Sequence, residues 1–150
     1  MEINRNDVQK LIQKLKDDNV WNHFLCVIKL DCNVNGHIQK NKINIWKQGI
    51  WTKAFYPIFI FEFNSQNHLI KITDKLNPIG RLLYLLFPIN YSIFFFSIII
   101  NDFKIKKFLI LMTVILTILI LYFLITKKIY KYEKKEQLEA IFKIIDKLKT

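Results

Sequence analysis

Residues 82–100 read LLYLLFPINYSIFFFSIII, nineteen consecutive residues without a charged side chain. At the rise of an α-helix they extend about 28 Å, close to the roughly 30 Å hydrocarbon core of a bilayer. A second uncharged block of the same length, FLILMTVILTILILYFLIT, covers residues 108–126, and only seven residues separate the two blocks. Because the connection is so short, the two helices must lie side by side and antiparallel. The sequence therefore predicts a transmembrane helical hairpin.

The N-terminal residues 1–77 are expected to form a small cytoplasmic α+β domain. An amphipathic helix is predicted over residues 6–18, with Asn6 as its cap and Gln9 as the reciprocal capping partner. Four apolar residues recur there at helical spacing and would lie on one face: Val8, Leu11, Ile12 and Leu15. Acidic residues in this helix make packing on a core the favoured interpretation over lying on a membrane.

An antiparallel β meander of four or five strands is predicted over residues 21–76. β-Branched and aromatic residues, or alternating apolar residues, mark candidate strands at 24–30, 42–47, 57–63 and 69–73. Asn35-Gly36 has the composition of a tight turn or bulge, and the polar cluster at 64–68 predicts a second turn.

The hairpin is expected to occupy residues 78–126, with spans at 82–100 and 108–126. Asn77 followed by Pro78 is typical of a helix start, because asparagine caps helices and proline suits their first position. Pro88 should kink the first span. Residues 127–150 predict a charged, cytoplasmic amphipathic helix that continues the second span, with one apolar stripe: Leu138, Ile141, Phe142, Ile145 and Leu148. The soluble part is large enough for a small core if this tail helix joins it.

Charge near the spans predicts which side each end occupies. Eight basic residues flank the two ends of the hairpin, against three in the connection, Lys104, Lys106 and Lys107. The eight are Lys71, Lys75, Arg81, Lys127, Lys128, Lys131, Lys134 and Lys135. Basic residues favour the cytoplasmic side, so a multi-pass protein of the inner membrane with both termini in the cytoplasm is predicted. Tyr84 and Tyr122 would both lie at the same interface.

Polar residues inside the hairpin need partners, because lipid offers none. Asn90 lies near the middle of the first block and Thr117 is the midpoint of the second. An interhelical polar contact from Asn90 to Thr113 or Thr117 is therefore predicted. The two threonines, one turn apart, also permit close helix approach. A polar transport path at Asn90 is the disfavoured alternative, because neither span contains a charged residue.

The candidates for chemistry are few. His23, His37 and His68 form no metal-binding spacing, and Cys26 and Cys32 match no zinc or redox motif. With three glycines in the chain, phosphate-binding loops are nearly excluded. No metal, cofactor or catalytic residue is therefore expected, and the protein is predicted not to be an enzyme.

The three tryptophans lie in the N-terminal half at positions 21, 46 and 51. Core packing of a small domain is the favoured interpretation. The alternative is an aromatic and basic surface on lipid headgroups, for which the candidate membrane contacts are Trp46, Trp51, Lys127, Lys128 and Lys131. A stacking platform for nucleic acid ranks last, so no nucleic-acid partner is expected.

The order of motifs resembles a family of uncharacterised small bacterial two-span membrane proteins with an N-terminal β domain. The stretches concerned are Val34-Asn35-Gly36-His37-Ile38, Ile43-Asn44-Ile45 and Phe55-Tyr56-Pro57-Ile58, followed by the hairpin and the charged tail. The match covers roughly residues 30–145 and departs at Val34 and Ile43, where the pattern prefers phenylalanine. This resemblance implies membrane location and a small β domain, and it implies no activity.

Three functions remain open on this basis. The first is a membrane-anchored, non-enzymatic binding or scaffolding module of unknown ligand. Its partners would be the lipid bilayer and either another protein or a second copy of the chain. The second is an immunity-type or accessory protein of a membrane complex, which a flat apolar patch would favour. The third is a lipid-acting enzyme, which a deep polar pocket in the β domain would favour.

Overall fold

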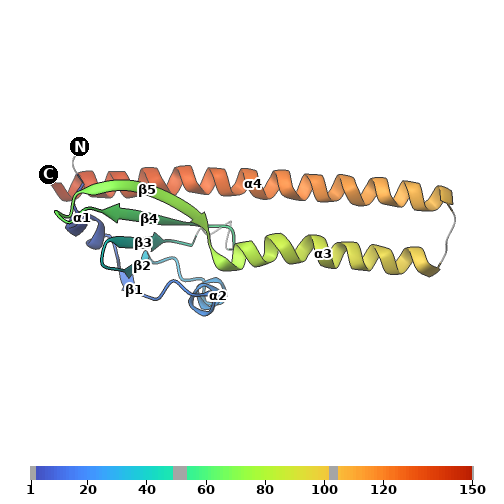
Figure 1. Cartoon of the computed structure of the whole chain (residues 1–150), viewed down its shortest axis with the longest axis horizontal. Coiled ribbons are helices and arrows are strands. Elements are labelled where there is room, and N and C mark those ends of the chain that lie inside the picture. The colour runs from blue at the N-terminus through green and yellow to red at the C-terminus, as the bar shows by residue number, and fades with distance from the viewer. Residues whose placement is uncertain (1–2, 49–53, 102–104, 150) are drawn as a thin grey trace.

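The computed structural model describes residues 3–48, 54–101 and 105–149. Among the described residues, a five-stranded sheet and two short helices gather at one end of the molecule, and two long helices project from it side by side (Figure 1). These long helices, α3 (Pro78–Asn101) and α4 (Ile105–Lys149), run antiparallel, and both chain termini lie at the end of the domain farthest from their connection. The α+β class is confirmed.

The sheet has the strand order β1-β2-β3-β4-β5. The strands β2 (Asn35–Ile38), β3 (Lys42–Trp46), β4 (Pro57–Phe63) and β5 (Leu69–Leu76) form the predicted antiparallel meander. The edge strand β1 (Lys14–Leu15) pairs parallel to β2, so the sheet is mixed.

The predicted helix over 6–18 is wrong beyond its first turn. The helix α1 spans Arg5–Gln9, and its cap is Asn4, whose backbone N–H donates to the Asp7 carboxylate over 3.0 Å, so Asn6 and Gln9 are not the capping pair. The backbone N–H groups of Gln13 and Lys14 then donate to the Val34 carbonyl. Pairing with the sheet edge thus replaces helical hydrogen bonds.

The predicted strand over 24–30 is also wrong, because these residues belong to helix α2 (Val20–Lys29). Asn19 caps α2 by accepting from the Asn22 N–H over 2.8 Å, and Leu30 ends it in a left-handed conformation with φ of 51°. Over the whole of Val20–Lys29 the polar residues Asn22, His23 and Lys29 do fall on one side of a helix, but the shorter stretch 24–30 contains only one polar residue, too few to show that spacing.

The predicted turn at Asn35-Gly36 lies inside β2 instead. Glycine is needed there for space rather than for a turn, because a Cβ on Gly36 would come within 2.4 Å of the Ile12 side chain. The chain reverses after β2 at residues 39–41, and the second predicted turn, at 64–68, is confirmed.

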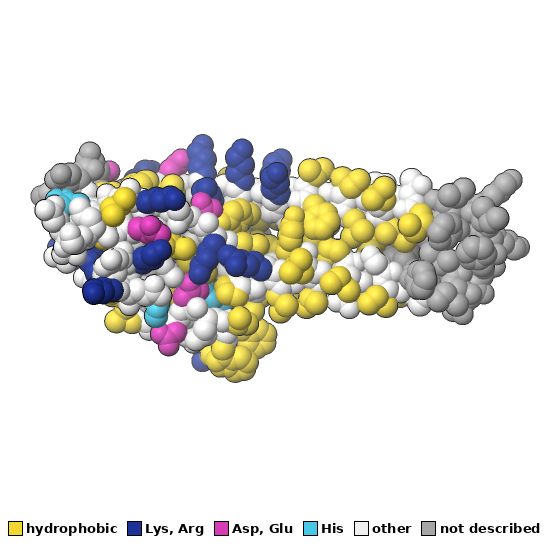
Figure 2. Space-filling model, in the orientation of Figure 1, with side chains coloured by type: hydrophobic (Ala, Val, Ile, Leu, Met, Phe, Trp, Pro, Cys, Tyr) yellow, Lys and Arg dark blue, Asp and Glu magenta, His cyan; other side chains and the backbone are white. Residues whose placement is uncertain are grey.

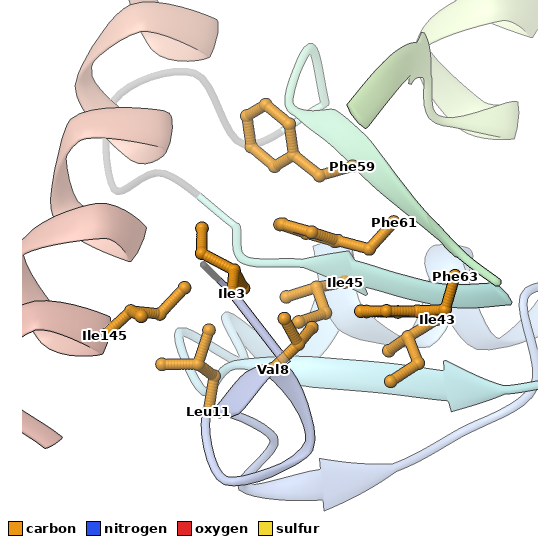
Figure 3. Packing of buried hydrophobic residues seen from close by; sticks show 9 residues of the cluster. All are labelled: Ile3, Val8, Leu11, Ile43, Ile45, Phe59, Phe61, Phe63 and Ile145. Carbon is orange, nitrogen blue, oxygen red and sulfur yellow. The ribbon is translucent and has the colours of Figure 1, made fainter. Parts of the chain in front are cut away.

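One face of the sheet forms the main core with α1 and the C-terminal part of α4. The strands contribute Ile43, Ile45, Phe59, Phe61 and Phe63, all buried. Figure 3 shows Ile145 pointing from α4 toward Ile3 and Leu11, and its side chain has no exposed surface. The tail helix therefore joins the core of the domain, as its apolar stripe requires.

The opposite face of the sheet packs against α2. Trp46, Tyr56 and Ile58 form a second buried cluster there, with Val27 of α2 against it. The sheet is thus covered on both faces, by α2 on one and by α1 and α4 on the other.

Asn77 joins the sheet to the hairpin and caps α3 as predicted. Its Oδ1 accepts from the Gly80 N–H over 2.9 Å, and its Nδ2 donates to the carbonyls of Ala54 and Tyr56 over 2.8 and 3.0 Å. A Cβ on Gly80 would lie 2.6 Å from the Ala54 carbonyl oxygen, so only glycine permits this close approach. Pro88 lies within α3, and the helix continues past it.

Candidate functional site

The two long helices expose a continuous apolar surface beyond the domain (Figure 2). On α3 the exposed side chains include Leu85, Ile89 and Ile93, and on α4 they include Leu116 and Leu124. Contiguous exposed apolar surface of this extent is rare on soluble monomers and marks contact with lipid or protein.

One helix of the described residues is long and apolar enough to cross a membrane, over Met112–Lys147. It contains most of the predicted second span, so this finding is compatible with membrane association. The first predicted span, 82–100, includes residues whose side chains are outside the described set, so the two-span layout stays a prediction.

Basic side chains border the apolar surface on its domain side. Lys127, Lys128 and Lys131 are exposed on α4, and Arg81 is exposed at the start of α3. Figure 2 shows Lys and Arg side chains over the domain and at the base of the hairpin, where the apolar surface begins. We call these four residues the basic collar. The connecting lysines Lys104, Lys106 and Lys107 have side chains outside the described part of the chain.

An aromatic cluster joins α3 and α4 just beyond the collar. The rings of Phe87 and Tyr122 stack with centroids 4.4 Å apart, and those of Tyr84 and Phe123 meet edge to face at 4.9 Å. The Tyr122 hydroxyl donates to the Leu83 carbonyl over 3.1 Å. These contacts set the register of the two helices.

This register places Asn90 level with the middle of the second block. Counting equal steps along both helices from the contacts of Tyr122 with Leu83 and Phe87 brings Asn90 opposite residues 115–119, which include Thr117. The Asn90 amide, however, donates to Leu86 of its own helix over 3.0 Å, and the Thr117 hydroxyl donates to Thr113 over 2.8 Å. The interhelical polar contact therefore stays a prediction.

The tryptophans occupy different environments. Trp46 is 1% exposed and packs in the core. The prediction that it contacts the membrane surface is therefore wrong. Trp21, in contrast, is 65% exposed on α2, where sequence reasoning favoured core packing. Trp51 lies outside the described residues. The favoured interpretation, core packing, therefore holds for Trp46 but not for Trp21.

A buried polar network lies between α2 and the sheet. Asp18 accepts from His23 Nε2 over 2.9 Å and from Lys75 Nζ over 2.7 Å, and Asn44 Nδ2 donates to the same carboxylate over 2.9 Å. His23 Nδ1 lies 2.7 Å from the Tyr56 hydroxyl. Burial opposes ionisation of Asp18, but the hydrogen bonds from His23 and Lys75 outweigh it and hold its pKa well below the usual range.

This network has the residue types of acid–base catalysis, but the imidazole at its centre is fully buried. Burial, with smaller contributions from Cys26 and Asp18, raises the pKa of the Tyr56 phenol far above neutrality. Because the ionised Asp18 carboxylate can only accept, His23 Nε2 donates to it, and in the neutral imidazole the protonated phenol donates to Nδ1. His23 is fully buried, and neither cavity described below is lined by these three residues. Its hydrogen bonds join Asp18 and His23 to Tyr56 and to the strands β3 and β5, and so hold α2 on the sheet.

A cavity of about 380 Å³ lies between α4 and the main-core face of the sheet. Its walls are mostly apolar and come from both sides, including Val34, Ile45, Phe59, Ile141 and Ile144. Its polar lining consists of Lys47, Glu133, Glu136 and Gln137. Glu133 is 7% exposed, and its carboxylate accepts from the Gln137 amide over 2.8 Å. A second, open depression beside β1 and β2 is lined by polar side chains such as Lys16, Asp17 and His37. The cavity between α4 and the sheet is thus mainly apolar, and the depression beside β1 is mainly polar.

Metal-ligating side chains do not gather anywhere in the part of the chain that the structure describes. His23, His37 and His68 lie on α2, on β2 and at the turn before β5, respectively. Cys26 is buried and Cys32 is exposed, and both are free thiols.

Comparison of the chain with family models, with curated proteins and with solved structures finds no match. The resemblance to small two-span membrane proteins therefore stays a prediction.

Proposed function

We propose that this chain is a non-enzymatic binding or scaffolding module, anchored in the inner membrane by a two-helix hairpin with both termini in the cytoplasm. The observation that supports it is the apolar surface shared by α3 and α4, bordered on the domain side by the basic collar. In a bilayer the apolar surface would face acyl chains and the collar would face anionic headgroups.

The arrangement of the domain fits this proposal. Both helices leave the domain in the same direction, so a hairpin that spans the bilayer keeps the sheet and both termini on one side (Figure 1). The cavity beside Glu133 is within the size range of small-molecule sites and is mostly apolar. It supports binding of a small, largely apolar ligand more than it supports hydrolysis of a lipid, for which a deep polar pocket was the expected sign.

Cysteine labelling tests the two spans and their orientation in intact membranes. Cys32→Ser first removes the exposed native thiol, and single cysteines then replace Leu116, Ile93 or Lys135, which are 60%, 62% and 79% exposed if lipid is ignored. With a water-soluble maleimide, Lys135→Cys should react in inside-out vesicles. Leu116→Cys and Ile93→Cys should react only after detergent denaturation, to an extent beyond that of the Cys32→Ser parent, which retains the buried Cys26.

The three variants separate the alternatives. Equal labelling of all three positions in intact membranes would exclude a hairpin in lipid. Labelling at position 93 with protection at 116 would leave one span. Labelling at position 135 from the outer face would reverse the orientation.

A further inference from the structure

The outward face of α2 is apolar over its whole length. Val20, Trp21, Phe24 and Ile28 are 57%, 65%, 39% and 59% exposed. At about 100° per residue these four positions fall within one side of the helix. The rings of Trp21 and Phe24 stack there with centroids 5.5 Å apart. We call these four residues the α2 apolar face.

The α2 apolar face cannot turn inward, because the other side of the helix is already fixed. His23 and Cys26 are buried against the sheet, and His23 is held by hydrogen bonds to Asp18 and Tyr56. Rotating the helix to bury Trp21 would break both bonds and expose the histidine. The apolar face is therefore a fixed part of the surface.

α2 lies at the base of the hairpin, where the membrane interface would be if the hairpin spans a bilayer. The helix contacts α3, and Figure 1 shows it beside the base of the hairpin, viewed nearly along its axis while α3 and α4 run across the picture. It therefore lies crosswise to the hairpin, as a helix in the plane of a membrane would. Figure 2 shows hydrophobic side chains over α2 adjoining the apolar surface of the hairpin.

The charges nearby favour an anionic lipid surface as the partner. α2 contains no acidic residue, and its last turn carries the exposed Lys29. The acidic residues beside it each face a basic side chain: Asp18 pairs with Lys75, Asp31 with Lys16, and Asp17 lies 3.3 Å from His37. The basic collar is at the same end of the domain, on the neighbouring helices. An apolar face with an exposed tryptophan, flanked by basic residues, is the composition of interfacial helices.

We propose that α2 is an interfacial helix whose apolar face enters the headgroup region of an anionic bilayer beside the hairpin. This inference rests on the proposed membrane anchoring. It adds a second contact, through which the sheet is held against the membrane instead of hanging from the hairpin alone. A protein partner on the same face is the competing occupant.

Depth-dependent quenching tests this contact in the full chain. All variants contain Cys32→Ser, and a fluorescent label is attached to a single cysteine replacing Ile28, Ile70 or Leu116. Ile70 is the matched control, because it is 67% exposed and lies at the beginning of β5, near the end of the domain farthest from the hairpin. The protein is reconstituted in vesicles of phosphatidylcholine and phosphatidylglycerol containing a lipid with a nitroxide near its headgroup.

We expect several-fold stronger quenching at position 28 than at position 70, and weaker quenching at 28 in vesicles of phosphatidylcholine alone. A nitroxide deep in the acyl chain should instead quench the label at position 116. Quenching at 116 without quenching at 28 would overturn the interfacial helix while leaving the anchoring intact. Absence of quenching at both positions would overturn the anchoring itself. A label at 28 that is aqueous in vesicles but shielded in native membranes would assign the face to a protein partner and refute the lipid contact.

Discussion

Replacing Ile145 with alanine should destabilise the domain although the residue lies five positions from the end of the chain. Its side chain is fully buried and packs toward Ile3, Val8 and Leu11 (Figure 3). Alanine removes three carbons and leaves a space that α1 and α4 close only in part, because both are held by other contacts.

The expected cost is about 3 kcal/mol, within the range for buried isoleucine to alanine changes. This corresponds to roughly a hundredfold change in the equilibrium between folded and unfolded domain. Ile144→Ala is the matched control, since it makes the same substitution in the same turn at a side chain that is 45% exposed. We expect it to cost less than about 1 kcal/mol.

Both variants are compared with the unmodified protein by urea unfolding in mild detergent. Near-ultraviolet circular dichroism reports the packing of the buried aromatic residues, among them Trp46 and Phe59. Equal shifts of the unfolding midpoint for the two variants, or a larger shift for Ile144→Ala, would show that the tail of α4 does not belong to the core.

Three further predictions concern polar groups. The Asp18 pKa is lower in the folded than in the unfolded chain, so its contribution to stability is complete above about pH 5 and is lost as the pH falls toward the folded-state value. Asp18→Asn should therefore flatten the acid side of a plot of unfolding midpoint against pH, and an unchanged slope would contradict the assignment. Asn77→Ala removes three hydrogen bonds at the start of α3 and should cost at least about 2 kcal/mol in the same urea assay; a cost near zero would mean that water replaces the amide. Cysteines replacing Asn90 and Thr117 should cross-link on oxidation, and the helix register is wrong if they never bridge while pairs one turn away do.

Much of the fold could be predicted where a short apolar run is bounded by strong turn or cap residues. The limits of β4 at Pro57–Phe63 and the start of α3 at Pro78 follow directly from such patterns. The errors have a different physical origin. Residues 24–30 contain one polar residue, Lys29, because α2 exposes an apolar face in addition to the side that it buries. The helical spacing becomes visible only over the longer stretch Val20–Lys29, which includes Asn22 and His23.

The N-terminal error arises from competition with a distant segment. Residues 6–15 have the spacing of a helix, but the backbone near Lys14 pairs with β2, some twenty residues later. In the candidate site, too, features set by local sequence could be predicted and features set by distant contacts could not. The uncharged blocks and the collar lysines are local patterns, whereas the bond between His23 and Tyr56 joins residues 33 positions apart, which no local pattern reveals.

The 45 residues of α4 form one helix from the connection with α3 to the core of the domain. Its length is about 67 Å, and no loop interrupts it between the apolar hairpin and Ile145. A continuous helix of this kind transmits a change of tilt from one of its ends to the other. If the hairpin spans a bilayer, a thinner or thicker membrane changes the tilt of α4, and the domain at the other end of the same helix tilts with it.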